Sequence, residues 1–193
     1  MQDRIDFATS EKFKYERMWQ HSVYRDNHVS VTHADFFIDH VSMPIGSTVF
    51  DIGCGSGVAS RRFADRGMRP LCADIASNAL DESNSDLPFL RCEIWDIPGR
   101  LIIDYGFCRD MMEHIPPDHV NATLASIRSA VTKDVYFNIS LREDVSGRLI
   151  GETLHLTVRP LEWWLDALNS HWSNVRVVST NEANKSATLL TAP

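Results

Sequence analysis

An alternation of short β-rich runs with runs of helical length constrains the fold more than any other feature of this chain. Residues 48–52 and 69–74 have the composition of buried strands, and residues 58–66 between them carry apolar groups at near-helical spacing. Strands are also predicted at 89–92, within 101–108 and at 135–139, and helices at 76–80, 118–131 and 160–168. This order predicts an α/β domain whose parallel sheet has helices on both faces. Two successive strands at 175–178 and 187–190, with no helix between them, predict that the chain ends in an antiparallel strand pair.

Length and composition indicate a single globular domain. The chain has 193 residues, of which 44% are hydrophobic and 23% are charged, which is enough for one core and too little for two ordinary domains. We expect residues 45–193 to form the α/β core and residues 1–44 to form a helical, aromatic-rich segment before it. No apolar run approaches the roughly 20 residues that span a bilayer, and the polar N-terminus is unlike a signal peptide. We therefore expect a cytoplasmic protein.

Charge and cysteine usage argue against two other classes of protein. The net charge is −7 and the only adjacent basic pair is Arg61-Arg62, whereas proteins that neutralise phosphates usually show a basic face. Nucleic acid is therefore not an expected partner. The cysteines form no CxxC pair and lie near the ends of apolar segments, which predicts reduced, buried thiols rather than disulfides or a zinc site. They are Cys54, Cys72, Cys92 and Cys108.

A glycine-rich turn at residues 53–57 separates the first strand from the helix that follows it. Glycines at such a point let a ligand approach the backbone closely. Asp51 lies at the end of the strand before the turn and Asp74 ends the next strand, at the edge where open α/β sheets bind ligands. Asp74 could accept hydrogen bonds from ribose hydroxyls. A tight turn without a ligand, a dinucleotide site and a helix-capping role for Asp74 are the alternatives.

The sequence Asp-Ile-Gly-Cys-Gly-Ser-Gly at 51–57, followed by Asp74, resembles the cofactor signature of class I S-adenosylmethionine-dependent methyltransferases. The resemblance covers roughly residues 48–178. It implies a Rossmann-like, doubly wound sheet of strand order 3-2-1-4-5-7-6 with strand 7 antiparallel. It also implies that Gly53, Gly55 and Gly57 surround the methionine portion of S-adenosylmethionine and that Asp74 binds its ribose.

Further cofactor contacts follow from the same resemblance. Residues 90–98 resemble the segment in which an acid meets the adenine amino group. Glu93 is the first candidate, with the backbone of Ile94 beside it, and Asp96 is the alternative. The remaining expected contacts are Trp19, Asp51, Cys54, Ile75 and Cys108.

The aromatic N-terminal residues are similar to helices that cover the cofactor in relatives. We therefore expect a lid, although packing alone would also explain the pattern. The residues concerned are Phe13, Tyr15, Trp19, Tyr24 and Arg25.

Residues 107–116 resemble the strand-four motif of small-molecule and quinone methyltransferases, especially the ubiquinone-pathway O-methyltransferases. Asp110, Glu113 and His114 stand at i, i+3 and i+4, so a helical turn would place them on one face. Such a trio is suited to act as a general base or to bind a hard divalent metal. The alternative is that the Glu-His pair only stabilises the turn. We take Glu113 and His114 as catalytic candidates and assign no metal. His155, in an expected substrate-side loop, is the third candidate, unless it is only a hydrogen-bonded loop residue.

The resemblance implies in-line methyl transfer from S-adenosylmethionine, with a base needed only if the acceptor must lose a proton. We expect a small-molecule acceptor, with a protein or peptide acceptor as the alternative, and the Glu-His motif favours a hydroxyl oxygen. The Asn/Asp-Pro-Pro-aromatic motif of enzymes that methylate base amines is missing after the fourth strand. The alternatives are a non-catalytic S-adenosylmethionine-binding partner protein and an NAD(P)-dependent oxidoreductase, although Val58-Ala59 after Gly57 departs from GxGxxG. The sequence predicts neither the acceptor nor the oligomeric state.

Overall fold

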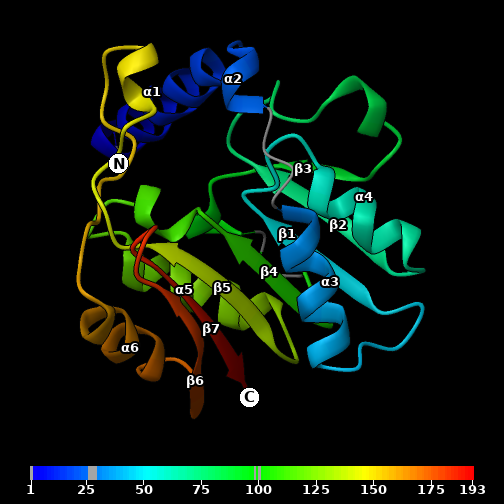
Figure 1. Ribbon diagram of the computed structural model, residues 1–193. Helices are drawn as coiled ribbons and strands as arrows, with labels where there is room; N and C mark the ends of the chain where they lie inside the picture. The colour runs from blue at the N-terminus through cyan, green and yellow to red at the C-terminus, as the bar shows by residue number, and fades with distance from the viewer. Residues whose placement is uncertain (1, 26–29, 98, 100) are drawn as a thin grey trace.

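The computed structural model describes residues 2–25, 30–97, 99 and 101–193, so small parts of the expected N-terminal segment and of residues 90–98 lie outside it. Its centre is a seven-stranded sheet of order β3-β2-β1-β4-β5-β7-β6 (Figure 1). β7 pairs antiparallel with β5 and β6, and the other neighbours are parallel, which confirms the expected fold and strand order. The strands are β1 (Thr48–Ile52), β2 (Arg69–Asp74), β3 (Phe89–Arg91), β4 (Tyr105–Arg109), β5 (Val135–Ser140), β6 (Asn174–Asn181) and β7 (Ser186–Ala192).

Helices cover both faces of this sheet (Figure 1). α3 and α4 pack on one face, and α5 and α6 pack on the other. The α-helices are α1 (Gln2–Met18), α2 (Ser22–Arg25), α3 (Ser30–His40), α4 (Val58–Asp65), α5 (Val120–Ala130) and α6 (Leu161–Asn169). The short 3-10 helices are η1 (Glu82–Asn84), η2 (Ile94–Asp96), η3 (Met112–His114) and η4 (Gly147–Leu149).

Alternation along each central strand divides the core between the two faces. In β1, Val49 joins the cluster that contains Phe63 of α4, whereas Phe50 joins the cluster that contains Leu124 of α5. Successive side chains of a strand point to opposite faces, so a parallel strand that is covered on both sides must be apolar throughout. The same alternation places Asp51 on the α4 side, where its neighbours are buried.

The prediction of a helix at residues 76–80 is wrong. No helix forms in this described stretch, and η1 begins only at Glu82. The carboxylate of Asp74 accepts the backbone N–H of Ala76 at 2.9 Å. Arg25, from the distant N-terminal segment, donates to the carbonyls of Asn78 and Ala79. Backbone groups that would form helical hydrogen bonds therefore have side-chain partners instead.

The N-terminal segment serves two different purposes. α3 contributes buried residues Ala34, Phe37 and Ile38 to the core, whereas α1 and α2 lie across the carboxyl edge of the sheet (Figure 1, blue). Arg17 of α1 forms an ion pair of 2.5 Å with Glu152, and the carbonyl of Glu16 accepts the side-chain N–H of Asn78 at 2.9 Å. α1 therefore joins the loop after β2 to the loop after β5.

Two further observations concern the cysteines and the lengths of the helices. All four cysteines are buried and free. Within the described residues, none of the helices is long and apolar enough to cross a membrane.

Candidate active site

The glycine turn connects β1 to α4 in a conformation that requires glycine. Gly53, Gly55 and Gly57 have φ angles of +72°, +54° and +82°, which other residues rarely adopt. Space is restricted as well, because a Cβ on Gly53 would lie 2.5 Å from Met111 and a Cβ on Gly55 would lie 2.6 Å from the Trp19 ring. The indole of Trp19 therefore rests on the turn itself.

Asp74 organises the backbone next to this turn. Its carboxylate accepts the N–H of Gly55 at 3.1 Å and the N–H of Ala76 at 2.9 Å. Burial raises the pKa of Asp74 to about 6, although these hydrogen bonds act in the opposite direction. A buried carboxylate is a strong acceptor for ligand hydroxyls.

Asp74 lies in the wall of a small cavity of about 90 Å³ at the carboxyl edge of the sheet. The other side chains around it are mostly apolar or aromatic: Tyr15, Trp19, Ile75, Ile94, Trp95, Met111 and Ile115. The wall also holds the polar residues Glu11, Asp110 and His114. A buried carboxylate such as Asp74 next to apolar and aromatic side chains suits a nucleoside, whose base is flat and apolar on its faces and whose sugar carries hydroxyls.

A larger cavity of about 330 Å³ adjoins the first. The two share Trp19, Tyr24, Gly53, Asp110 and His114 in their walls, so they form one cleft along the edge of the sheet. The larger part is polar, with Arg109, Glu113, Ser140, Arg142, Asp144, Ser146 and His155 around it.

Most of the residues predicted from the sequence meet in this cleft. The walls contain Trp19, Gly53, Cys54, Gly55, Asp74, Ile75 and Ile94 of the predicted cofactor contacts, and Glu113, His114 and His155 of the predicted catalytic residues. The predicted contacts outside the walls are Asp51, Gly57, Glu93, Asp96 and Cys108. The roles assigned to both groups stay predictions.

The residues outside the cleft walls have other partners. Asp51 accepts the hydroxyl hydrogen of Ser60 in α4 at 2.7 Å, and burial raises its pKa to about 7. Gly57 faces Leu80. Glu93 forms an ion pair with Arg91 at 3.2 Å.

Glu113 is the most buried acid of the cleft. It lies in η3, and its side chain is fully shielded from solvent. Oε1 accepts the N–H of Ser140 at 3.2 Å, while Oε2 has no hydrogen-bond partner among the described residues. Burial raises the pKa of Glu113 well above its ordinary value, and the nearby charge of Asp110 adds to the effect. An unpaired buried carboxylate is costly, so this side chain is suited to binding a cation or a hydroxyl.

His114 is held by groups from two distant parts of the chain. Its Nδ1 lies 2.9 Å from the hydroxyl of Tyr15 in α1 and 3.2 Å from the carbonyl of Leu154. Burial, followed by the charge of His155, lowers the pKa of His114 to about 3. The imidazole is therefore neutral at physiological pH.

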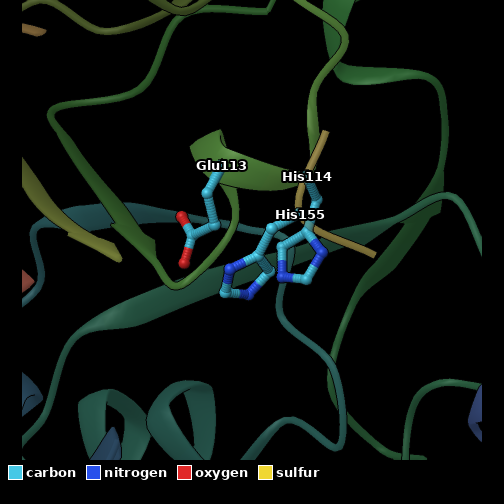
Figure 2. Close-up of side chains that lie close together, drawn as sticks. All are labelled: Glu113, His114 and His155. Carbon is cyan, nitrogen blue, oxygen red and sulfur yellow. The ribbon is translucent and has the colours of Figure 1, made fainter. Parts of the chain in front are cut away.

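His155 lies beside His114, with the two rings nearly perpendicular and their centroids 4.9 Å apart. Its Nδ1 is 2.7 Å from the carbonyl of Arg142. The backbone carbonyl of Glu113 accepts the N–H groups of Leu156 and Thr157, which brings the loop of His155 to η3. Figure 2 shows the resulting group of Glu113, His114 and His155, whose ligand atoms lie within 4.8 Å of one another.

The trio expected from spacing was Asp110, Glu113 and His114, and the structure assembles a different close group. Asp110 is in the cleft wall but pairs with Arg109 at 2.8 Å. It also has a left-handed backbone, with φ +47°. His155 takes its place beside Glu113 and His114.

Several functional groups have no clear signal in the sequence. The carbonyls of Leu154 and Arg142 hold the two histidines. Asp144 accepts the N–H groups of Ser146, Gly147 and Leu154 and so fixes the loop that carries them. Backbone carbonyls cannot be read from residue type, and only the short Asp144–Ser146 spacing is typical of an Asx turn.

Comparison with known proteins gives matches in sequence and in structure. Residues 49–134 match the model of a methyltransferase domain. The ubiquinone biosynthesis O-methyltransferase of Hahella chejuensis is 27% identical over 139 residues, which are 65% of this chain and 58% of that protein. The chain therefore spans little more than half the length of that relative.

Solved structures of low sequence identity share the fold. The magnesium protoporphyrin IX methyltransferase from Synechocystis PCC 6803, with S-adenosylhomocysteine bound, superposes with a TM-score of 0.67 at 16% identity, over 96% of this chain and 95% of that one. The 1,6-didemethyltoxoflavin-N1-methyltransferase of Burkholderia thailandensis gives a TM-score of 0.70 at 15% identity, over 96% and 87%.

Proposed function

We propose that the chain is a class I S-adenosylmethionine-dependent methyltransferase that methylates a hydroxyl group of a small molecule. Its strand order and the methyltransferase-domain match at residues 49–134 support this family. One observation carries the proposal. The nucleoside-type cavity around Asp74 shares its wall with the polar cavity around Glu113, His114 and His155, and Gly53 of the glycine turn belongs to both walls.

The residues of the smaller cavity fit S-adenosylmethionine. Asp74 is a buried acceptor for the ribose hydroxyls, and Ile75, Ile94 and Trp95 offer apolar contacts to the adenine. Gly53 and Gly55 lie in the cleft wall, and the absence of a Cβ lets Met111 and Trp19 pack directly on the turn that would hold the methionine portion. When bound, S-adenosylmethionine supplies an activated sulfonium methyl group, so the protein's main task is to align the acceptor.

The larger cavity suits a polar acceptor. A hydroxyl must lose its proton as it is methylated, and the group of Glu113, His114 and His155 is the part of the wall able to bind it and promote that loss. His114 is neutral. With Nδ1–H donated to the carbonyl of Leu154 and the Tyr15 hydroxyl donated to the same carbonyl, its other nitrogen is able to accept a hydrogen bond. The match to a ubiquinone biosynthesis O-methyltransferase supports oxygen as the atom methylated.

α1 and α2 complete the proposed site as a lid. Tyr15 and Trp19 stand in the wall of the smaller cavity, and Arg25 ties the segment to the loop after β2 through Asp81 and two carbonyls. Closing such a segment excludes water from the reacting groups. A small-molecule acceptor, the absence of a nucleic-acid partner and a cytoplasmic location stay predictions from the sequence.

Calorimetry with S-adenosylhomocysteine and with NADH tests the proposal first. We expect S-adenosylhomocysteine to bind with a Kd in the micromolar range, roughly −8 kcal/mol, and NADH not to bind. Transfer of labelled methyl groups to a panel of phenols and catechols then tests the activity, with matched anilines as the control for nitrogen acceptors. Tighter binding of NADH would favour the oxidoreductase. Binding without transfer to any acceptor would favour a non-catalytic partner protein.

A further inference from the structure

We propose that Glu113, His114 and His155 form a binding site for one divalent transition-metal ion at the acceptor end of the cleft. The role of this ion rests on the proposed function, because the site lies where the acceptor hydroxyl would bind. Binding of the ion itself is independent of that function and is measured separately below.

The first argument is the geometry of the three side chains. Each offers one ligand atom, and these atoms lie within 4.8 Å of one another. Ligand atoms around a zinc ion at about 2.1 Å are separated by roughly 3 to 4 Å, so small side-chain rotations would bring all three onto one ion. Figure 2 shows that Glu113 and His114 come from η3, whereas His155 comes from a separate loop.

The second argument is the orientation of both imidazoles. Nδ1 of His114 lies 3.2 Å from the carbonyl of Leu154, and Nδ1 of His155 lies 2.7 Å from the carbonyl of Arg142. A carbonyl only accepts, so each ring can place its N–H on Nδ1 and keep Nε2 as an unprotonated ligand. The Tyr15 hydroxyl, 2.9 Å from Nδ1 of His114, is compatible with this tautomer because it is able to donate to the carbonyl of Leu154 at 3.5 Å. Histidines that bind metals nearly always donate their other N–H to a carbonyl or carboxylate in this way.

The third argument is the unpartnered oxygen of Glu113. Oε1 is fixed by the N–H of Ser140, but Oε2 is buried without a hydrogen-bond partner among the described residues. Among the residues that the structure describes, no lysine or arginine forms an ion pair with the carboxylate of Glu113. A bound cation would give Oε2 a partner and would stabilise the carboxylate form, which burial alone disfavours.

The donor set indicates which ion would bind. Two imidazoles and one carboxylate suit zinc and its first-row neighbours, whereas Mg²⁺ prefers oxygen ligands alone. Three protein ligands leave a fourth position open toward the larger cavity. A hydroxyl oxygen bound there would have a lowered pKa, and its proton would pass to solvent. His114 would then act as a ligand and would not itself accept the proton.

Metal binding is tested on full-length protein without a histidine tag, after treatment with a chelator and dialysis. Calorimetric titration with Zn²⁺, Mn²⁺ and Mg²⁺ should show one tight zinc site per chain and much weaker binding of Mg²⁺. His155→Ala and Glu113→Gln should weaken zinc binding by at least roughly 10- to 100-fold, a loss seen even when only groups that orient a ligand are changed. His171→Ala is the matched control, because this histidine bonds to Asn121 away from the cleft.

Titration with S-adenosylhomocysteine keeps the two proposals apart. We expect its affinity to be unchanged in His155→Ala, which also shows that the variant is folded. If Glu113→Gln fails to fold, His155→Ala decides the question, since His155 is the less buried of the two residues. The metal site is overturned if wild-type protein binds no zinc, or if His155→Ala binds it as tightly as wild type. Zinc binding without S-adenosylhomocysteine binding would instead contradict the proposed function and leave the metal site standing.

Discussion

The hydroxyl of Tyr15 lies 2.9 Å from Nδ1 of His114, although the two residues are 99 positions apart. Tyr15 belongs to α1 and His114 to η3, so this contact joins the proposed lid to the proposed acceptor site. The two rings also meet edge to face, with centroids 5.7 Å apart. On the proposed function, a closed lid would therefore do more than cover the cofactor, because the Tyr15 contact also helps to fix the orientation of His114.

Tyr15→Phe tests this coupling because it removes the hydroxyl and keeps the ring. One hydrogen bond contributes about 0.5–1.5 kcal/mol, so we expect kcat to fall by up to about 10-fold. The affinity for S-adenosylhomocysteine should change little. Phe13→Leu, at an exposed position of the same helix, is the control. An unchanged kcat together with weaker cofactor binding would show that Tyr15 serves the cofactor and not His114.

Asp74→Asn should weaken the binding of S-adenosylhomocysteine by about 1–3 kcal/mol, because ribose hydroxyls would lose a charged acceptor in a buried site. The fold should persist, since asparagine still offers one acceptor to the neighbouring N–H groups. Calorimetry and thermal unfolding measure the two effects separately. Asp86→Asn changes an exposed acid and is the control. Unchanged affinity with a lower Tm would mean that Asp74 only supports the turn.

The sheet was predictable from the sequence because its signals are local. Apolar runs such as residues 48–52 and glycine turns such as 53–57 are formed by neighbours in the chain. The helix expected at 76–80 failed for the opposite reason, since Arg25 binds the carbonyls of Asn78 and Ala79 from about fifty positions away. Asp51, an expected cofactor contact, lies on the α4 face by strand alternation and accepts a hydrogen bond from Ser60, so its role at the cofactor stays a prediction.

The close group of the site could be predicted only in part. Glu113 and His114 were recognisable because they belong to one short motif. His155 was singled out separately, but the spacing argument placed Asp110 in the trio instead. The backbone carbonyl of Glu113 decides the outcome, because it binds Leu156 and Thr157 and so brings His155 into place. Such a contact between two loops leaves no pattern in the sequence.

The pKa of Asp51 predicts a pH-dependent difference in stability. Its pKa is raised by burial to about 7 in the folded protein, against an ordinary value near 3.9. The folded state therefore holds a proton that the unfolded state has lost, and stability contributed by this group declines as pH rises toward 7. Asp51→Asn keeps an acceptor for Ser60 and removes the titration.

The free energy of unfolding, measured with urea between pH 5 and pH 8, checks this prediction. The stability of Asp51→Asn relative to wild type should rise by at most about 1.4 kcal/mol per pH unit up to pH 7, and then level off. Taking the difference between variant and wild type cancels the opposite contribution of His114, whose pKa is lowered. A difference that stays constant across this range would show that Asp51 is ionised throughout.

Arg25 holds the lid to the body of the domain, and its loss should loosen the lid without unfolding the protein. Its guanidinium pairs with Asp81, donates to the carbonyls of Asn78 and Ala79, and lies over the Trp19 ring at 5.6 Å. Arg25→Ala should therefore increase the dissociation rate of S-adenosylhomocysteine in stopped-flow measurements, while the association rate and Tm change little. Arg176→Ala, which changes an exposed arginine on the edge strand β6, is the control.

Deletion of residues 1–25 extends the test, and we expect it to abolish turnover while the remaining domain stays folded. A truncated chain that is insoluble, because buried Met18 is lost from the interior, would identify α1 as part of the core. In that case an unchanged dissociation rate in Arg25→Ala would show that the segment does not act as a lid.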